Sequence, residues 1–179
     1  MTKRNSLVWI VCFSISIASA TAQNFLPPAI EWKGKSELLI AKAGNAWITP
    51  TEKSGFINTP SYKETMDWLK KLDAASPLLR MISIGKSVEG RDINMIIAST
   101  EKNITASALK NSAKPLLLVQ AGIHSGEIEG KDAGMMLLRD IGFGNKKYLL
   151  DKVNFLFIPI LSVDAHERTS PYNRPNQRG

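Results

Sequence analysis

The amino-acid sequence predicts a layered α/β fold, and three observations lead to that prediction. Two near-continuous apolar runs, residues 114–123 and 153–163, are typical of central strands that are buried on both faces of a sheet. Residues 127–144, which lie between these runs, form a helical pattern that is apolar on most sides. Residues 80–100 resemble two strands joined by a turn at Glu89 and Gly90. A strand, a helix and another strand in succession usually pack as layers, so we expect an α/β domain.

Two helices are expected with definite ends. Residues 61–76 repeat apolar residues at helical spacing, follow Pro60 and open with a Ser61-x-x-Glu64 capping box. The helix in residues 127–144 should end at one of the glycines of the sequence "GFG". We interpret "GFG" as a helix stop and not as part of a phosphate-binding loop, because it follows a helical pattern.

Length and composition fit a single globular domain. The chain has 179 residues, and 44% of them are hydrophobic, which is enough for a sizeable core. The formal net charge is +7, with 23 basic and 16 acidic residues. The basic residues are spread along the chain, apart from a small basic end at 173–179. Because nucleic-acid binders cluster their basic residues, we predict no nucleic-acid partner.

The first 22 residues have the pattern of a cleavable signal peptide. Lys3 and Arg4 form a basic start, a short apolar stretch follows, and small residues precede Gln23. The apolar stretch is too short to span a bilayer comfortably, so we predict no stable membrane insertion. Cleavage before Gln23 would lower the net charge to +5 and give a secreted or periplasmic protein.

The only cysteine, Cys12, lies within this signal and should be lost with it. We therefore expect no disulfide, and any metal site must use nitrogen and oxygen ligands. Residues 23–60 contain several prolines and little periodicity, and we predict that they form an irregular lead-in segment.

His124 and Glu127 are the candidate metal ligands. They lie where the first apolar strand ends and the next helix begins, in the sequence "LLLVQAGIHSGEIEG". Ligand sites of open α/β sheets lie at the carboxyl ends of strands, and a His-x-x-Glu pair across a turn can direct two ligands at one zinc ion. Spacing and position alone leave a hydrogen-bonded structural histidine as an equal alternative.

Four segments together resemble the zinc carboxypeptidases of the carboxypeptidase A type. They are "WITPTEKSGFINTPSYKETMDWLKKL", "ISIGKSVEGRDINMIIAS", "GIHSGEIEGKDAGMMLLRD" and "LSVDAHERTSPYNRPNQRG", and they occur in the order and spacing typical of that family. The resemblance implies a three-layer mixed sheet with helices on both faces, incomplete at its carboxyl end. It also implies that His124 and Glu127 are two of three zinc ligands.

The resemblance also identifies a departure and an arginine. The family's Asn-x-Asp-Gly segment reads here Ser162-Val163-Asp164-Ala165, which keeps the aspartate but not the asparagine and glycine. In family members an arginine shortly after this segment polarises the scissile carbonyl. We expect Arg174 to take this catalytic role, with Arg178 as the rival.

Other functional residues of the family have no match before Gly179. These are the third zinc ligand, a histidine; the asparagine and arginine that bind the substrate carboxylate; a tyrosine; and the glutamate that serves as general base. His166 is the only other histidine, and its place in the turn favours a surface or hydrogen-bonding role. The sequence therefore resembles the amino-terminal part of a catalytic domain, inactive by itself.

Three functions remain open at this point. The first is a secreted zinc carboxypeptidase that acts on peptides or proteins, with a signal peptide at 1–22, a lead-in at 23–60 and the amino-terminal part of the catalytic domain at 61–179. The second is a zinc-dependent deacylase of acyl-amino acids from the same superfamily, although the "GKSVEGR" turn and the lead-in favour the peptidase. The third is a non-catalytic binding module on the same scaffold. The sequence leaves the substrate side chain and the oligomeric state open.

Overall fold

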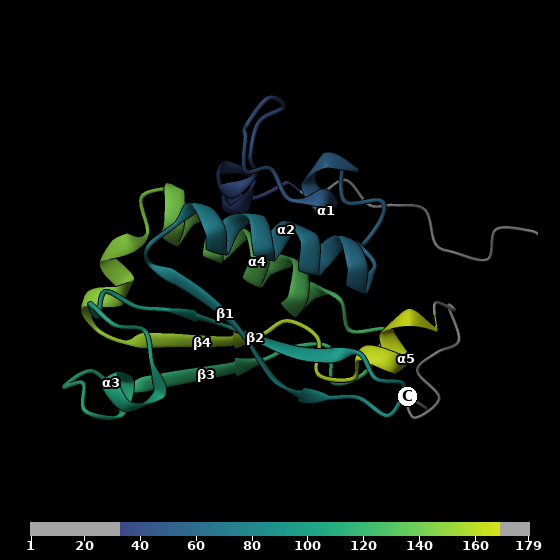
Figure 1. Cartoon of the computed structure of the whole chain (residues 1–179). Helices are drawn as coiled ribbons and strands as arrows, with labels where there is room; N and C mark the ends of the chain where they lie inside the picture. Colours follow the sequence, from purple (N-terminus) through teal and green to yellow (C-terminus); the bar gives the residue numbers. More distant parts are fainter. Residues whose placement is uncertain (1–32, 169–179) are drawn as a thin grey trace, which may run out of the picture. The chain divides into compact units, whose positions relative to one another are not determined.

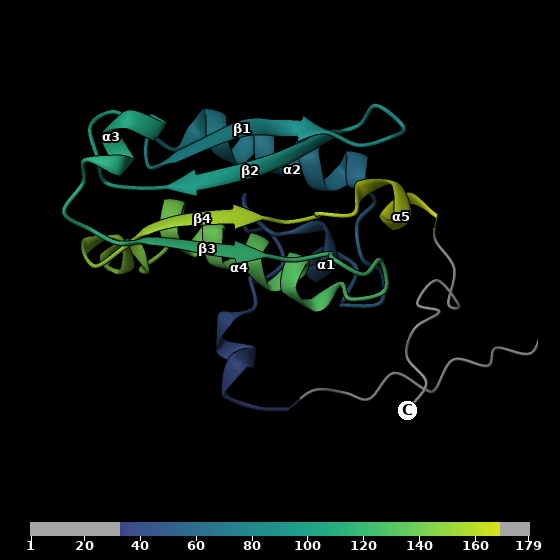
Figure 2. The same ribbon diagram turned by 90° about the horizontal axis from the view of Figure 1, so that it is seen from below.

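Residues 33–168 are described by the structure, a computed structural model, and they contain one mixed four-stranded sheet (Figure 1). The strands are β1 (Leu79–Lys86), β2 (Asp92–Ala98), β3 (Leu116–Gln120) and β4 (Asn154–Ile158). Their order in the sheet is β1-β2-β4-β3. β1 and β2 form the expected hairpin, β2 pairs antiparallel with β4, and β4 pairs parallel with β3 (Figure 2). The mixed α/β sheet predicted from the sequence is confirmed.

Helix α2 (Tyr62–Ala75) forms where the periodic pattern and the capping box predict it. Ser61 Oγ accepts a hydrogen bond from Glu64 N, and Glu64 Oε2 accepts one from Ser61 N at 2.9 Å. These reciprocal bonds satisfy two backbone groups that would otherwise lack partners in the first turn. The helix buries Met66, Leu69 and Leu72 in the core.

Helix α4 (Glu129–Phe143) supplies the other main core surface. Its C-cap is Gly144, so the "GFG" sequence is a helix stop as predicted. Met135, Leu138 and Ile141 are buried in one cluster with α2 and the sheet. In the described part of the chain, α2 and α4 lie on the same face of the sheet (Figure 1).

The two apolar runs have different positions in the sheet. β4 lies between β2 and β3 and is largely buried, as expected of a central strand. β3 lies at an edge, and all five of its residues are exposed, so the prediction of a strand buried on both faces is wrong for the described residues. Apolar composition suits burial but does not show which strand has neighbours on both sides.

The lead-in segment is anchored to α4 by a buried ion pair. The 3₁₀ helix η1 (Lys35–Leu39) and the short helix α1 (Pro50–Lys53) lie in this segment. Arg139 Nη1 donates to both carboxylate oxygens of Glu52 at 2.6 Å. Glu52 also accepts hydrogen bonds from the backbone of Ala41 and Thr49. Burial alone would raise the pKa of Glu52, but these hydrogen bonds hold it below its usual value. The buried carboxylate is therefore ionised, and both of its oxygens accept hydrogen bonds.

Besides η1 and α1 of the lead-in, three short helical segments within residues 61–168 were not anticipated from the sequence. They are α3 (Ala106–Lys110), the 3₁₀ helix η2 (Lys147–Asp151) and α5 (Val163–Glu167). Each has five residues, which is too short to show a helical period in the sequence. No helix within residues 33–168 is long and apolar enough to cross a membrane.

The contact between α4 and β4 gives a test of the packing. A Cβ atom added at Gly134 would overlap the ring of the buried Phe157. We expect Gly134→Ala to lower the free energy of unfolding by about 1–3 kcal/mol, the usual cost of overpacking a core. Gly142→Ala is the matched control in the same helix, because its nearest contact would be Ser76 Oγ at 3.3 Å. We expect that variant to change the free energy by less than about 1 kcal/mol.

Urea unfolding followed by circular dichroism measures both variants. Equal stability of the two alanine variants would show that α4 does not pack against Phe157 as described.

Candidate metal centre

His124 and Glu127 lie together in the turn between β3 and α4. His124 Nδ1 is 3.0 Å from Glu127 Oε2, and the backbone N–H of Glu127 donates to the carbonyl of His124 at 3.0 Å. The side chains are 53% and 40% exposed, so both are accessible from solvent. The turn lies at the carboxyl ends of the two parallel strands, the end of a sheet at which α/β proteins bind ligands.

The path of the chain into this turn depends on Gly122. Its φ of +59° lies in the left-handed region, and an added Cβ would be 3.0 Å from the Cα of Ile160. Only glycine fits both requirements. Beyond the strand ends, the N–H of Leu161 donates to the carbonyl of Ala121, and the N–H of Ser162 donates to that of Gly122, each at 3.0 Å. The turn is therefore fixed to the segment that follows β4.

Asp164, the aspartate that the segment Ser162–Ala165 shares with the family's Asn-x-Asp-Gly motif, binds the turn between β1 and β2. Its carboxylate accepts hydrogen bonds from Ser87 Oγ at 2.8 Å, from Glu89 N at 3.0 Å and from Arg91 Nη1 at 2.6 Å. Burial alone would raise the pKa of the Asp164 carboxyl, but these hydrogen bonds hold it below its usual range. Asp164 thus connects the "GKSVEGR" turn to α5, next to the His124 turn.

A buried polar network joins α5 to the start of α4. Lys131 is 0% exposed, and its Nζ donates to the carbonyl of Pro60 at 2.6 Å and lies 3.1 Å from His166 Nε2. His166 Nδ1 lies 3.2 Å from Glu167 Oε1, which also accepts from the N–H of Tyr62. Burial lowers the pKa of Lys131, and burial with the nearby Lys131 charge lowers the pKa of His166. A neutral His166 that accepts from Lys131 and donates to Glu167 satisfies both ring nitrogens.

His166 is therefore a hydrogen-bonding residue of the interior, because it is buried and not on the surface. The hydrogen-bonding part of the prediction is confirmed, and the surface alternative is wrong. The burial of Lys131 could not be predicted from the sequence, because a lysine in a helix is ordinarily a solvated residue.

The donor set of the His124 turn fits zinc in part. Imidazole nitrogen and carboxylate oxygen are zinc ligands, and two ligand atoms of a tetrahedral site with bonds of roughly 2.0–2.2 Å lie about 3.3–3.6 Å apart. The observed 3.0 Å between Nδ1 and Oε2 is a hydrogen-bond distance and is shorter than that separation, so the two atoms would have to move slightly apart to hold a cation between them. Among residues 33–168, however, no group of three or more His, Cys, Asp or Glu side chains could hold a metal ion. Residues 33–168 therefore offer two candidate ligands at this turn.

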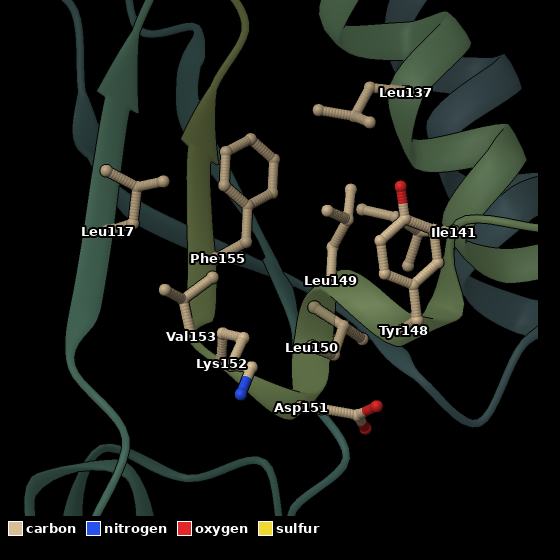
Figure 3. A pocket seen from close by; sticks show the side chains of 10 residues that line it. All are labelled: Leu117, Leu137, Ile141, Tyr148, Leu149, Leu150, Asp151, Lys152, Val153 and Phe155. Carbon is tan, nitrogen blue, oxygen red and sulfur yellow. The ribbon is translucent and has the colours of Figure 1, made fainter.

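An apolar cavity lies elsewhere, against the amino-terminal halves of β3 and β4. It has a volume of about 460 Å³ and is lined by residues of η2, α4 and both strands, among them Leu117, Leu149 and Phe155 (Figure 3). His124 and Glu127 are not among its lining residues. We assign no part of the candidate metal centre to it.

Several predicted features lie outside the described residues. These are the signal peptide at 1–22 with Cys12, the catalytic candidate Arg174 and its rival Arg178.

The fold and the His-x-x-Glu turn together define a mixed-sheet α/β protein with a candidate metal centre. The family model described as zinc carboxypeptidase matches residues 65–179, so this chain belongs to the zinc carboxypeptidase family. A curated relative is the inactive metallocarboxypeptidase ecm14 of Schizosaccharomyces pombe, 28% identical over 109 residues. That match covers 57% of this chain and 22% of the relative.

Solved structures, among them a carboxypeptidase, share the fold. The carboxypeptidase A of Helicoverpa armigera superposes with a TM-score of 0.52 at 20% identity, over 61% of this chain and 26% of that chain. Thrombin activatable fibrinolysis inhibitor superposes with a TM-score of 0.56 at 20% identity, over 78% of this chain and 35% of that one. At these identities the likeness shows the fold alone. The chain spans between about a fifth and about a third of the length of these relatives.

The depressed pKa of His166 predicts how stability depends on pH. The unfolded histidine, with its ordinary pKa near 6.5, takes up a proton before the folded one does. The stability contributed by neutral His166 is therefore present above about pH 6.5 and is lost as the pH falls through the lower folded pKa. We expect the urea midpoint to decrease from pH 7 to pH 5, and to decrease less in His166→Gln.

Glutamine keeps an acceptor for Lys131 but does not titrate, so the difference between the two pH profiles reports the titration of His166. Parallel pH profiles for the two proteins would contradict the prediction.

Proposed function

We propose that this protein is an exported zinc-dependent metallocarboxypeptidase, which releases carboxyl-terminal residues from peptides or proteins. The observation that carries the proposal is the 3.0 Å approach of His124 Nδ1 and Glu127 Oε2 at the carboxyl end of β3. Family membership supports it, because the matched family is that of the zinc carboxypeptidases. Residues 61–179 would form the amino-terminal part of the catalytic domain.

The chain's own residues would divide the work as follows. His124 and Glu127 would hold the cation from one exposed turn, whose backbone is fixed to the segment after β4. When bound, zinc supplies Lewis-acid activation of water at neutral pH. Arg174 would stabilise the negative charge that develops on the scissile carbonyl oxygen. In the resembled family, a histidine as third zinc ligand and a proton-transfer glutamate complete the site. Neither has a matching position before Gly179.

A non-catalytic module is the second candidate, and a specific observation favours it. The curated relative is named an inactive metallocarboxypeptidase. A chain of this kind would keep the scaffold and lose hydrolysis. Against it, the adjacent imidazole and carboxylate retain the chemistry of zinc ligands. The family model, described as zinc carboxypeptidase, favours the peptidase over the deacylase alternative.

Zinc binding in the full-length gene product tests the proposal. We expect His124→Ala and Glu127→Gln each to remove stoichiometric zinc and carboxypeptidase activity together, because a catalytic zinc site uses three protein ligands. Glu129→Gln is the matched control, since Glu129 is an exposed carboxylate two residues away. Metal analysis and release of carboxyl-terminal residues from blocked dipeptides provide the readouts. Zinc retained in both ligand variants would refute the metal site, and zinc bound without turnover would favour the non-catalytic module.

Zinc titration of residues 23–179 alone tests whether this part of the chain can bind zinc without further residues. Residues 23–179 alone should bind zinc weakly and be inactive, because residues 33–168 offer two ligands and contain no third. Tight binding of one zinc per chain, with turnover that a chelator abolishes, would show that a ligand and a base lie elsewhere in residues 23–179.

Export is the remaining part of the proposal and is supported by the pattern of residues 1–22. We expect amino-terminal sequencing of the exported protein to begin at Gln23. A mature protein that retains Met1 would contradict export through a cleaved signal.

A further inference from the structure

The hydroxyl of Ser162 is directed at the backbone of the candidate metal centre. Ser162 Oγ donates a hydrogen bond of 2.7 Å to the carbonyl of Ile123, the residue immediately before His124. Ser162 is also the N-cap residue of α5, where a serine side chain ordinarily accepts from its own helix. Here the side chain makes no capping bond. The hydroxyl bonds the His124 turn instead of its own helix.

The backbone of Ser162 is itself held in place on both sides. Its N–H donates to the carbonyl of Gly122 at 3.0 Å, and its carbonyl accepts from the N–H of His166 at 2.9 Å. The next residue, Val163, is buried in the core. The donor oxygen of Ser162 therefore extends from a fixed backbone position.

The bond to Ile123 acts on His124 through the peptide plane. The carbonyl of Ile123 and the N–H of His124 belong to one planar unit, so fixing the carbonyl restricts the backbone orientation of His124. Side-chain packing can contribute little here, since Ile123 is 48% exposed and His124 is 53% exposed. The contact of Nδ1 with Glu127 Oε2 orients the ring, and the bond from Ser162 restricts the backbone that carries the ring.

We propose that Ser162 is a positioning residue for His124, and that its hydroxyl holds the turn in the orientation in which the imidazole meets a divalent cation beside Glu127. This inference rests on the proposed function, because it assumes that His124 is a metal ligand. Loss of groups that orient ligands typically weakens metal affinity by 10–100-fold. Ser162 acts on the backbone and not on the ring, so we expect the lower end of that range, about tenfold.

The test measures Zn²⁺ affinity of the full-length gene product by competition with a chromophoric chelator. Ser162→Ala should bind Zn²⁺ about tenfold more weakly than the wild type. Ser162→Thr keeps the hydroxyl and should restore the affinity. Ser87→Ala is the control, because it removes a serine hydroxyl that bonds Asp164 on the same helix without contacting the His124 turn.

Two further readouts separate positioning from folding. The urea midpoint of the metal-free protein should be similar in Ser162→Ala and Ser87→Ala, while Zn²⁺ affinity falls only in the former. The visible spectrum of the Co²⁺-substituted protein should change in Ser162→Ala and be normal in Ser162→Thr, because it reports the geometry of the ligands.

The outcomes distinguish this inference from the proposed function. If His124→Ala loses Zn²⁺ and Ser162→Ala keeps wild-type affinity, the positioning role is overturned and the metal site stands. If Ser162→Thr fails to restore affinity, or if Ser87→Ala loses as much, the positioning role is likewise overturned. If His124→Ala keeps Zn²⁺, the proposed function fails first, and Ser162 has no ligand to position.

Discussion

The parallel pairing of β3 with β4, continued beyond the ends of both strands, is the constraint on which the rest of the candidate centre depends. Five residue pairs align the strands, from Leu116 with Asn154 to Gln120 with Ile158. The hydrogen bonds then continue through Ala121 and Gly122 to Leu161 and Ser162. Because this pairing keeps the two chain segments together after the sheet ends, the His124 turn and α5 leave the sheet side by side.

The residues of helix α5 contact three different parts of the fold. Asp164 binds the turn between β1 and β2, while His166 and Glu167 connect to Lys131 and the start of α2. Five residues cannot form a stable helix alone, so its position must come from these tertiary contacts. Charged and polar groups are buried here, but each one named has a hydrogen-bond partner, which limits the cost of burial. The polar network and the strand pairing therefore hold one end of the sheet together.

A buried ion pair holds the lead-in segment against the other side of α4. The Glu52–Arg139 pair is almost completely buried, and breaking such a pair by removing one partner usually costs about 3–5 kcal/mol. The stacking of Trp47 on Phe143, with ring centroids 4.1 Å apart, lies in the same region. The segment that precedes the matched family region is thus a packed part of this unit. The exposed apolar residues of β3 are the contrasting feature, because they make that edge a surface that favours association with further strands.

The sequence by itself determined the elements whose signals are local. The capping box at Ser61 and Glu64, the turn at Gly90 and the stop at Gly144 each depend on neighbours within a few residues, and all three are where the sequence predicts them. It also placed His124 and Glu127 just beyond the end of a strand, because the apolar run 114–123 ends immediately before His124. Only the tertiary structure decided that β4 is central and β3 is an edge, because the two apolar runs are alike in composition and differ in their neighbours. Only the tertiary structure brought Ser162 to Ile123 and His166 to Lys131, because these contacts join residues 39 and 35 positions apart and leave no periodic trace in the sequence.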